Sequence, residues 1–168
     1  NIINNYTINY YVTSKKLYDE YVNIHEYKKP IKIIHDVCNK DIYKPDNLER
    51  FSLDNISNRP LVIGWVGNSE RKIDGIDLKG LHTIIKPVIS KLKEEGYNIT
   101  EHYADRNVRW RNSLEMAEYY SEIDMCLCTS IHEGTPLPLL EGMSCGVPII
   151  STDVGIVPEA FGEKQKEF

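Results

Sequence analysis

The amino-acid sequence predicts an α/β fold in which a doubly wound parallel sheet is covered by helices on both faces. Strand-like and helix-like segments alternate from residue 61 to residue 152, and such alternation predicts right-handed crossovers between parallel strands. The first strand candidate of this block, 61–67, is an almost continuous apolar run. Runs of this kind are typical of strands that are buried on both faces.

The segments before this block predict a strand, a short helix, a second strand and a linker. Residues 10–13 and 30–34 have the composition of strands, and Ser14 is placed to cap the helix between them. One side of that helix is apolar and is formed by Leu17, Tyr18, Tyr21 and Val22. Residues 39–59 lose periodicity and gather Asp, Asn, Ser and Pro, which indicates a linker with room for a turn of helix.

Two amphipathic helices are predicted after the first strand of the sheet. The segments in order are a helix at 79–95, a strand at 97–103, a polar loop at 105–112 and a helix at 113–123. Gly96 is placed to end the first helix, and Pro87 predicts a kink within it. The positions expected to face the core are Leu81, Ile84, Ile85, Val88, Ile89 and Leu92 in the first helix and Leu114, Ala117 and Tyr120 in the second.

The last part of the block predicts two strands, at 124–129 and 147–152, with a helix between them. Thr135 is a candidate N-cap for this helix. Pro136 and Pro138 fit its first turn, because the N–H groups that they lack would have no partner within the helix there.

Composition excludes several classes of protein. Hydrophobic residues make up 41% of the 168 residues and charged residues 27%, which is the balance of an ordinary globular protein. The net charge is -5, and the basic residues are dispersed apart from Arg106, Arg109 and Arg111, so no nucleic-acid partner is expected. These three arginines could bind anions, but the sequence favours a solvated loop. Trp110 beside them could stack on a ligand, whereas Trp65 within its apolar strand is expected in the core.

The cysteines and the apolar runs indicate a cytoplasmic protein. Cys38, Cys126, Cys128 and Cys145 show neither zinc-site spacing nor the density of a secreted scaffold, and Cys126 and Cys128 are expected to be small buried residues on one face of a strand. No apolar run reaches the roughly 20 residues that span a bilayer, and residues 1–5 lack the features of a signal peptide. Peripheral membrane association through parts outside this chain is left open.

Three loops are expected at the carboxyl edge of the sheet, where open α/β sheets bind ligands: 67–80, 130–138 and 152–158. In the middle loop, the N–H groups of Gly134, Thr135 and Leu137 can point at an anion or a sugar hydroxyl at a helix N-terminus. Glu141, farther along that helix, could accept hydrogen bonds from a pair of vicinal ribose hydroxyls. Taken alone, Glu133 is better explained as a residue that complements the helix dipole, and Glu141 as a solvated helix residue.

Residues 130–152 resemble the signature stretch of the family-4 (group 1) retaining glycosyltransferases. Glu133 and Glu141 match the E-x7-E motif of that family, and Gly155 with Pro158 and Glu159 resembles its following loop. Members of this family adopt the GT-B fold of two facing Rossmann-like domains. The resemblance therefore implies that the sheet is the Rossmann-like, nucleotide-sugar-binding domain.

The resemblance also implies a role for each matching residue. Glu133 would face the donor sugar near the reacting centre without acting as a covalent nucleophile, and Glu141 would hold the ribose hydroxyls. The segment of Gly134, Thr135, Pro136 and Leu137 would contact phosphate and sugar.

Lys79, followed by Gly80, would neutralise the leaving diphosphate. The family's earlier basic residue is replaced by Asn68 here, so either Asn68 binds the donor by hydrogen bonding or Arg71 supplies the charge. The hypothesis requires Glu133, Glu141 and Lys79 to converge on one crevice.

The implied function is transfer of a sugar, with retention, from a nucleotide-diphospho-sugar to a hydroxyl of a carbohydrate, lipid or protein acceptor. The resemblance implies no metal or other cofactor, since GT-B enzymes generally do without a bound divalent metal, and the sequence has no Asp-x-Asp motif for one. Residues 1–45 resemble the end of the acceptor-side domain, 46–60 a linker and 61–168 a truncated donor-binding domain. The chain alone is therefore expected to bind the donor but to transfer sugar poorly.

Two alternatives remain. A non-catalytic nucleotide-binding or regulatory α/β module would be consistent with Asn68. A flavodoxin-like signalling domain would need an acidic cluster after the first strand, and residues 67–69 do not supply one.

Overall fold

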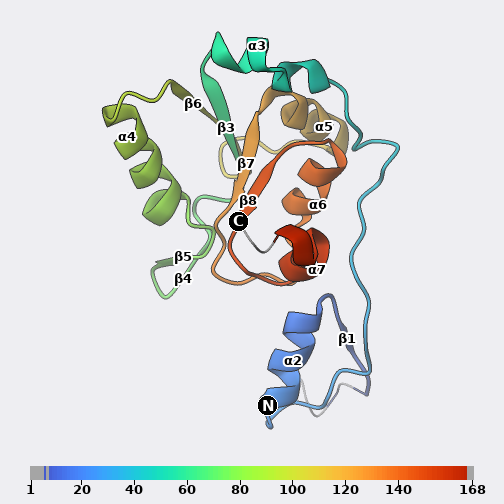
Figure 1. Cartoon of the computed structure of the whole chain (residues 1–168). Helices are drawn as coiled ribbons and strands as arrows, with labels where there is room; N and C mark the ends of the chain where they lie inside the picture. Colours follow the sequence, from blue (N-terminus) through green and yellow to red (C-terminus); the bar gives the residue numbers. More distant parts are fainter. Residues whose placement is uncertain (1–5, 7, 166–168) are drawn as a thin grey trace. The chain divides into compact units, whose positions relative to one another are not determined.

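The computed structural model describes Tyr6 and residues 8–165, and these form two compact units (Figure 1). Unit 1 contains the N-terminal segment up to Val37, the loop His132–Leu137 and the C-terminal segment from Asp153. Unit 2 contains Cys38–Ile131 and Pro138–Thr152. Each unit is described by itself. Two segments with predictions lie outside the described residues. They are residues 1–5, which lack the features of a signal peptide, and residues 166–168 at the far end of the predicted donor-binding domain.

Unit 2 is built on a parallel sheet of four strands in the order β6-β3-β7-β8. The strands are β3 (Leu61–Gly67), β6 (Ile99–Asp105), β7 (Met125–Cys128) and β8 (Ile149–Ser151). The helices around the sheet are α4 (Lys86–Glu94) on one side and α5 (Ser113–Glu122) and α6 (Leu137–Ser144) on the other (Figure 1). The predicted doubly wound α/β fold is confirmed.

Two hydrophobic clusters cover the two faces of the sheet. On one face, Ile63 and Trp65 of β3 pack with the helix side that carries Leu81, Ile85 and Ile89. On the other face, the core is formed by Tyr43, Ala104, Tyr119, Tyr120, Ile123, Cys126, Cys145 and Val147. Burial on both faces explains why β3 is apolar at nearly every position.

The predicted helix at 79–95 is divided into two parts. A π-helical turn, η2 (Leu81–Ile85), precedes α4, and Pro87 lies in the first turn of α4, where its missing N–H costs nothing. The apolar stripe is also narrower than predicted. Ile84 and Val88 are 40% and 49% exposed, because the sheet is contacted by positions four residues apart. Gly96, with φ +91°, ends the helix as predicted.

Helix α5 buries Tyr120 as predicted, and Ala117 packs against the same core, but the third predicted position does not face the core. Tyr119 and Tyr120 are 2% and 1% exposed, whereas Leu114 is 66% exposed. At about 100° per residue, Leu114 lies on the side of the helix opposite Ile123. The prediction that Leu114 faces the core was therefore wrong.

The segment predicted to be a linker has structure of its own. It contains the 3₁₀ helix η1 (Leu48–Phe51) and the short helix α3 (Leu53–Ser57). Upstream of both, Tyr43 is 6% exposed within the core of unit 2. Residues 38–60 therefore group with the sheet, while the predicted domain boundaries at 45 and 60 stay predictions.

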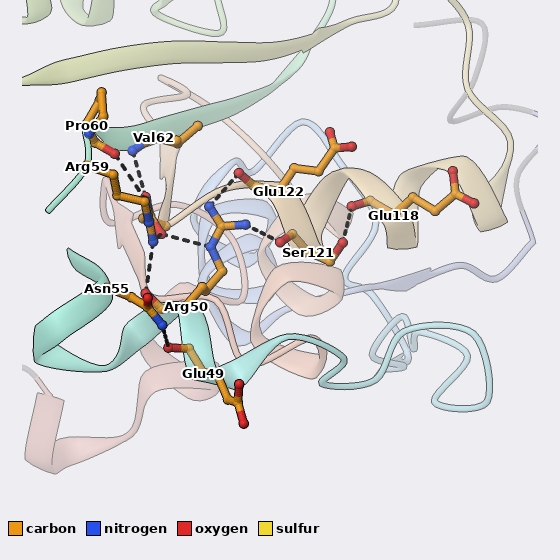
Figure 2. Close-up of polar contacts among 10 residues, drawn as sticks. Glu49, Arg50, Asn55, Arg59, Pro60, Val62, Glu118, Ser121 and Glu122 are labelled. Carbon is orange, nitrogen blue, oxygen red and sulfur yellow. Dashed lines mark hydrogen bonds and ion pairs between the residues drawn. The ribbon is translucent and has the colours of Figure 1, made fainter.

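A buried carboxylate ties this segment to the sheet. Asp124, whose side chain is 1% exposed, accepts hydrogen bonds from Arg50 Nε at 2.9 Å, Arg59 Nη1 at 2.5 Å and the N–H of Val62 at 2.7 Å. Figure 2 shows the Arg50 guanidinium also reaching the backbone carbonyl groups of Ser121 and Glu122. The network joins η1, α5 and the amino end of β3.

Unit 1 contains the N-terminal elements and the end of the chain. Its elements are the parallel strands β1 (Tyr11–Val12) and β2 (Lys32–Ile33), helix α2 (Lys15–Asn23), helix α7 (Val157–Phe161) and the 3₁₀ helix η3 (Glu163–Gln165). Ser14 caps α2 by accepting the N–H of Leu17, as predicted. Helix α7 was not predicted. No helix within the described part of the chain is both long and apolar enough to cross a membrane.

Replacement of Asp124 by Asn is expected to destabilise unit 2 by about 3 to 5 kcal/mol at pH 7, because two arginines then lose their buried partner. Burial raises the pKa of Asp124, but hydrogen bonds from Arg59, Arg50 and Val62 outweigh it and hold the pKa at about 2. The folded-state pKa lies below the ordinary value, so the carboxylate stabilises the fold above about pH 4, and this contribution is lost as the pH falls towards 2.

Urea unfolding of Asp124→Asn and the parent chain at several pH values measures this difference. Asp46→Asn, which changes an exposed aspartate, is the control. A difference between Asp124→Asn and the parent that does not shrink below pH 4 would contradict the assignment.

Candidate functional site

Unit 2 has a cavity of about 300 Å³ at the carboxyl ends of β3 and β6. It is lined by Val66, Gly67, Asn68, Arg71, Lys79, Ala104, Arg106, Arg109, Trp110, Arg111, Met116 and Pro138. Five of these side chains are cationic, and none is a carboxylate. A concave surface of this charge at a sheet edge is suited to an anionic ligand.

Hydrogen bonds to the backbone carbonyl group of Lys79 fix this residue in the cavity wall. Its carbonyl oxygen accepts hydrogen bonds from the indole Nε1 of Trp65 at 3.3 Å and from the hydroxyl of Thr129 at 2.9 Å. Gly80 has φ +71°, and a Cβ there would lie 2.7 Å from the carbonyl oxygen of Thr129. Only glycine fits this turn, so the predicted pair of Lys79 and Gly80 is fixed against the core.

Asp77 organises the same turn. Its buried carboxylate accepts hydrogen bonds from the N–H groups of Lys79 at 3.2 Å, Gly80 at 3.0 Å, His82 at 2.8 Å and Thr83 at 3.2 Å. Burial raises the pKa of Asp77, but these donors outweigh it and the pKa lies below its ordinary value. Asp77 was not among the predicted site residues, although an acidic residue just before the start of a helix is a recognisable capping signal.

Asp105, at the end of β6, joins two loops that line the cavity. Its carboxylate accepts the N–H of Ser69 at 3.1 Å and that of Asn107 at 3.0 Å. The N–H of Arg106 donates to the carbonyl oxygen of Gly67 at 2.8 Å. The loop that follows β6 is therefore fixed to the loop that follows β3.

The arginine loop after β6 is exposed to solvent, as predicted, and its Arg106, Arg109 and Arg111 also line the cavity. Arg109 forms an ion pair with Glu115, and the Arg111 guanidinium lies 5.7 Å from the centroid of the Tyr119 ring. Trp110 is 63% exposed at the cavity, whereas Trp65 is 1% exposed in the core as predicted. The position of this loop directly after a strand, at the carboxyl edge of the sheet, was the signal that could have identified it as part of the cavity.

Glu141 has a buried partner. Its Oε2 accepts a hydrogen bond from the hydroxyl of Tyr120 at 2.9 Å. Burial, followed by the charge of Glu141, raises the pKa of Tyr120 well above its ordinary value, so this hydroxyl keeps its proton. Glu141 is not among the described residues that line the cavity, and its predicted contact with ribose stays a prediction.

The predicted phosphate-binding loop belongs to unit 1. The carbonyl oxygen of Gly134 accepts the N–H of Ile156 at 3.1 Å, and a Cβ on Gly155 would lie 2.0 Å from that oxygen. A Cβ on Gly134 would in turn lie 2.7 Å from Thr13 Oγ1. Two glycines therefore allow the loop to pack closely within unit 1.

Thr135 does not cap the following helix. Its hydroxyl is buried and makes no hydrogen bond with the described residues, and α6 begins at Leu137 with Pro138 in its first turn. Because α6 begins at Leu137, Pro136 and not Thr135 immediately precedes its first residue, so this prediction was wrong. Glu133 and Pro136 also belong to unit 1. The predicted convergence of Glu133 with Lys79 and Glu141 stays a prediction.

The structure is thus a doubly wound α/β domain with a cationic cavity at the carboxyl edge of its sheet, which is the edge where open α/β sheets bind ligands. Residues 60–168 match the family described as Glycosyl transferases group 1. The chain belongs to this family.

Two relatives bear names from this group of enzymes. The chain is 32% identical over 79 residues to the Bacillus subtilis protein named "Putative teichuronic acid biosynthesis glycosyltransferase TuaC", a match covering 47% of this chain and 18% of that protein. It is 50% identical over 34 residues to the Escherichia coli O-antigen chain mannosyltransferase B, covering 20% of this chain and 9% of that protein. The matches thus span less than a fifth of either relative.

A solved structure shares the fold. The sucrose-phosphate synthase of Thermosynechococcus elongatus matches with a TM-score of 0.57 at 19% identity, over 90% of this chain and 42% of that one. The α/β sheet is accordingly of the GT-B type, as the sequence predicted.

Replacement of Asp77 by Asn is expected to destabilise the chain by about 2 to 3 kcal/mol, because the buried N–H donors of Lys79, Gly80 and His82 then lose a charged acceptor. Urea unfolding at pH 7 measures the effect. Asp74→Asn is the matched control, since Asp74 is exposed in the same loop and its φ of +51° suits Asn. Equal stability of the two variants would contradict the role of Asp77.

Proposed function

We propose that this chain is the donor-binding part of a retaining glycosyltransferase, which transfers a sugar from a nucleotide-diphospho-sugar to an acceptor hydroxyl. The observation that carries the proposal is the cavity at the carboxyl edge of β3 and β6, with its cationic side chains and fixed Lys79. Membership in the glycosyltransferase family supplies the reaction class.

The cavity suits the diphosphate of such a donor. Lys79 and arginine side chains offer charge-assisted hydrogen bonds to phosphate oxygens, and Asn68 adds an amide donor beside them. A volume of about 300 Å³ is at the lower limit of small-molecule sites, so only part of the donor would occupy it. The exposed ring of Trp110 offers an apolar surface to the nucleoside.

The proposed chemistry follows from the charge that develops. As the bond between the sugar and the diphosphate breaks, negative charge grows on the leaving group and the sugar becomes oxocarbenium-like. Lys79 would stabilise the leaving group, together with the N–H groups of Gly134, Thr135 and Leu137. Because the chain's own cations supply this charge, the proposal includes no metal or other cofactor.

The two motif carboxylates would hold the donor rather than react with it. Glu133 would orient the hexose near the reacting carbon, and Glu141 would accept hydrogen bonds from the ribose hydroxyls. Tyr120, which donates to Glu141 Oε2, would act as a positioning residue by fixing the direction of that carboxylate.

The acceptor is a carbohydrate, lipid or protein hydroxyl, and residues that bind it would lie on the acceptor-side domain to which residues 1–45 are assigned. The relatives' names mention teichuronic acid and O-antigen chains, and one of them is a mannosyltransferase. These names favour a carbohydrate acceptor and make mannose a first donor sugar to test.

The proposed location is the cytoplasm. The described cysteines, Cys38, Cys126, Cys128 and Cys145, form no disulfide, which agrees with this location.

Transfer assays with the full-length protein test this proposal. Lys79→Gln is expected to lower kcat about 100-fold or more, because it removes a charge that matters most as the bond breaks. Glu141→Gln is expected to act chiefly by raising KM, since ribose contacts are similar before and during the reaction. Glu118→Gln, on the exposed side of α5, is the control. Unchanged kinetics in both test variants would overturn the assignment.

The chain alone is expected to bind the donor but to transfer sugar poorly. Calorimetry with UDP-, GDP- and ADP-sugars, alongside a transfer assay of the chain, measures both properties. Transfer by the chain at the rate of the full-length protein would contradict this expectation. Weak binding of every donor, unaffected by Glu133→Ala or Glu141→Ala, would favour the non-catalytic regulatory module that Asn68 suggests.

A further inference from the structure

We infer that Arg106, from the loop after β6, supplies the second cation for the donor's diphosphate, in place of a basic residue in the loop after β3. This inference rests on the proposed function. Arg106 lies in a loop that the sequence predicts to be solvated. Its charge would compensate for the absence of a basic residue at the position of Asn68.

The pairing of β3 with β6 puts Arg106 beside Asn68. The two strands are parallel and in register to their last residues, with Gly67 opposite Asp105. Arg106 comes one residue later, and its N–H donates to the carbonyl oxygen of Gly67 at 2.8 Å. The side chains of Asn68 and Arg106 therefore start from adjacent points, and both line the cavity.

The backbone that carries Arg106 is held on both sides. Asp105 precedes it, is 9% exposed and accepts the N–H groups of Ser69 and Asn107 at 3.1 and 3.0 Å. Burial raises the pKa of Asp105, but the hydroxyl and N–H of Ser69 and the N–H of Asn107 outweigh it, so the group stays ionised at neutral pH. A fixed backbone lowers the entropy that Arg106 loses when it binds a phosphate.

Gly67 lines the cavity between these loops. A Cβ there would lie 2.5 Å from the Trp65 ring, so glycine leaves room for that buried indole at the end of β3. Lys79 and Arg106 line the same cavity.

The other arginines of the cavity are less suited to this task. Arg109 forms an ion pair with Glu115, whose carboxylate is itself held by the N–H of Asn112 at 2.9 Å. Arg111 lies over the Tyr119 ring. Arg71 is exposed, as Arg106 is, but it lies at the start of a small hairpin of the two-residue strands β4 (Lys72–Ile73) and β5 (Ile76–Asp77), whose Ile73 and Ile76 are also exposed.

Charge balance agrees with a pair made of Lys79 and Arg106. The diphosphate of a nucleotide sugar has one negative charge on each phosphate, so a lysine and an arginine match it. An arginine adds a planar fork that can bind two phosphate oxygens at once, which a lysine cannot do.

Calorimetry with this chain tests the inference, using the nucleoside diphosphate among UDP, GDP and ADP that the parent binds best and the matching nucleoside. Arg106→Gln is expected to lose about 10- to 100-fold in affinity for the diphosphate and nothing for the nucleoside. Arg106→Lys should recover part of the loss. The control Lys91→Gln, on exposed α4, should change the affinity less than threefold. Arg71→Gln tests the alternative cation and should lose less affinity than Arg106→Gln.

Each outcome separates this inference from the proposed function. If the parent binds no nucleotide, the proposed function fails, and the inference with it. If the parent binds but Arg106→Gln binds equally well, or if Arg71→Gln causes the loss instead, only the inference is overturned. An equal loss for the nucleoside would also overturn it, because Arg106 would then act on the base or the fold. Equal thermal unfolding of the variants and the parent guards against misfolding.

Discussion

A buried carboxylate must be matched by hydrogen-bond donors, and three aspartates impose this constraint on the whole of unit 2. Asp124 binds two arginines at the amino end of the sheet. Asp77 and Asp105 are matched instead by N–H groups of the loops at the carboxyl end. Asp124 and Asp105 join segments that are distant in sequence, and Asp77 fixes the turn that carries Lys79, so the same three groups close the fold and shape its cavity.

The two ends of the sheet consequently serve different purposes. At the amino end, Arg50 and Arg59 form ion pairs with Asp124, and that region has a structural role. At the carboxyl end, the buried aspartates accept hydrogen bonds from backbone N–H groups, and the side chains of Lys79 and Arg106 are among those that line the cavity. Rigid backbone beneath cationic side chains is the preorganisation that catalysis by charge stabilisation requires.

Much of the fold could be predicted from the sequence, because the strands of a doubly wound sheet are apolar and its turns carry glycine. Two kinds of feature could not. The buried side of α5 depends on which turn meets the sheet, so Leu114 was misplaced. The arginine loop and Asp77 become meaningful only when strand order is known, since β6 and β3 are neighbours in space but are separated by a helix in the chain. Motif residues were easier to select than their partners, and Tyr120 shows why: its bond to Glu141 links separate helices.

The two tryptophans occupy opposite environments within unit 2. Trp65 is sealed in the core with its indole N–H on the Lys79 carbonyl, whereas Trp110 is largely exposed at the cavity. Intrinsic fluorescence from this chain therefore combines two signals of different origin. Emission from the sealed indole reports on the integrity of the sheet, and quenching of the exposed one reports on occupancy of the cavity, so the molecule contains its own optical probes for folding and for ligand.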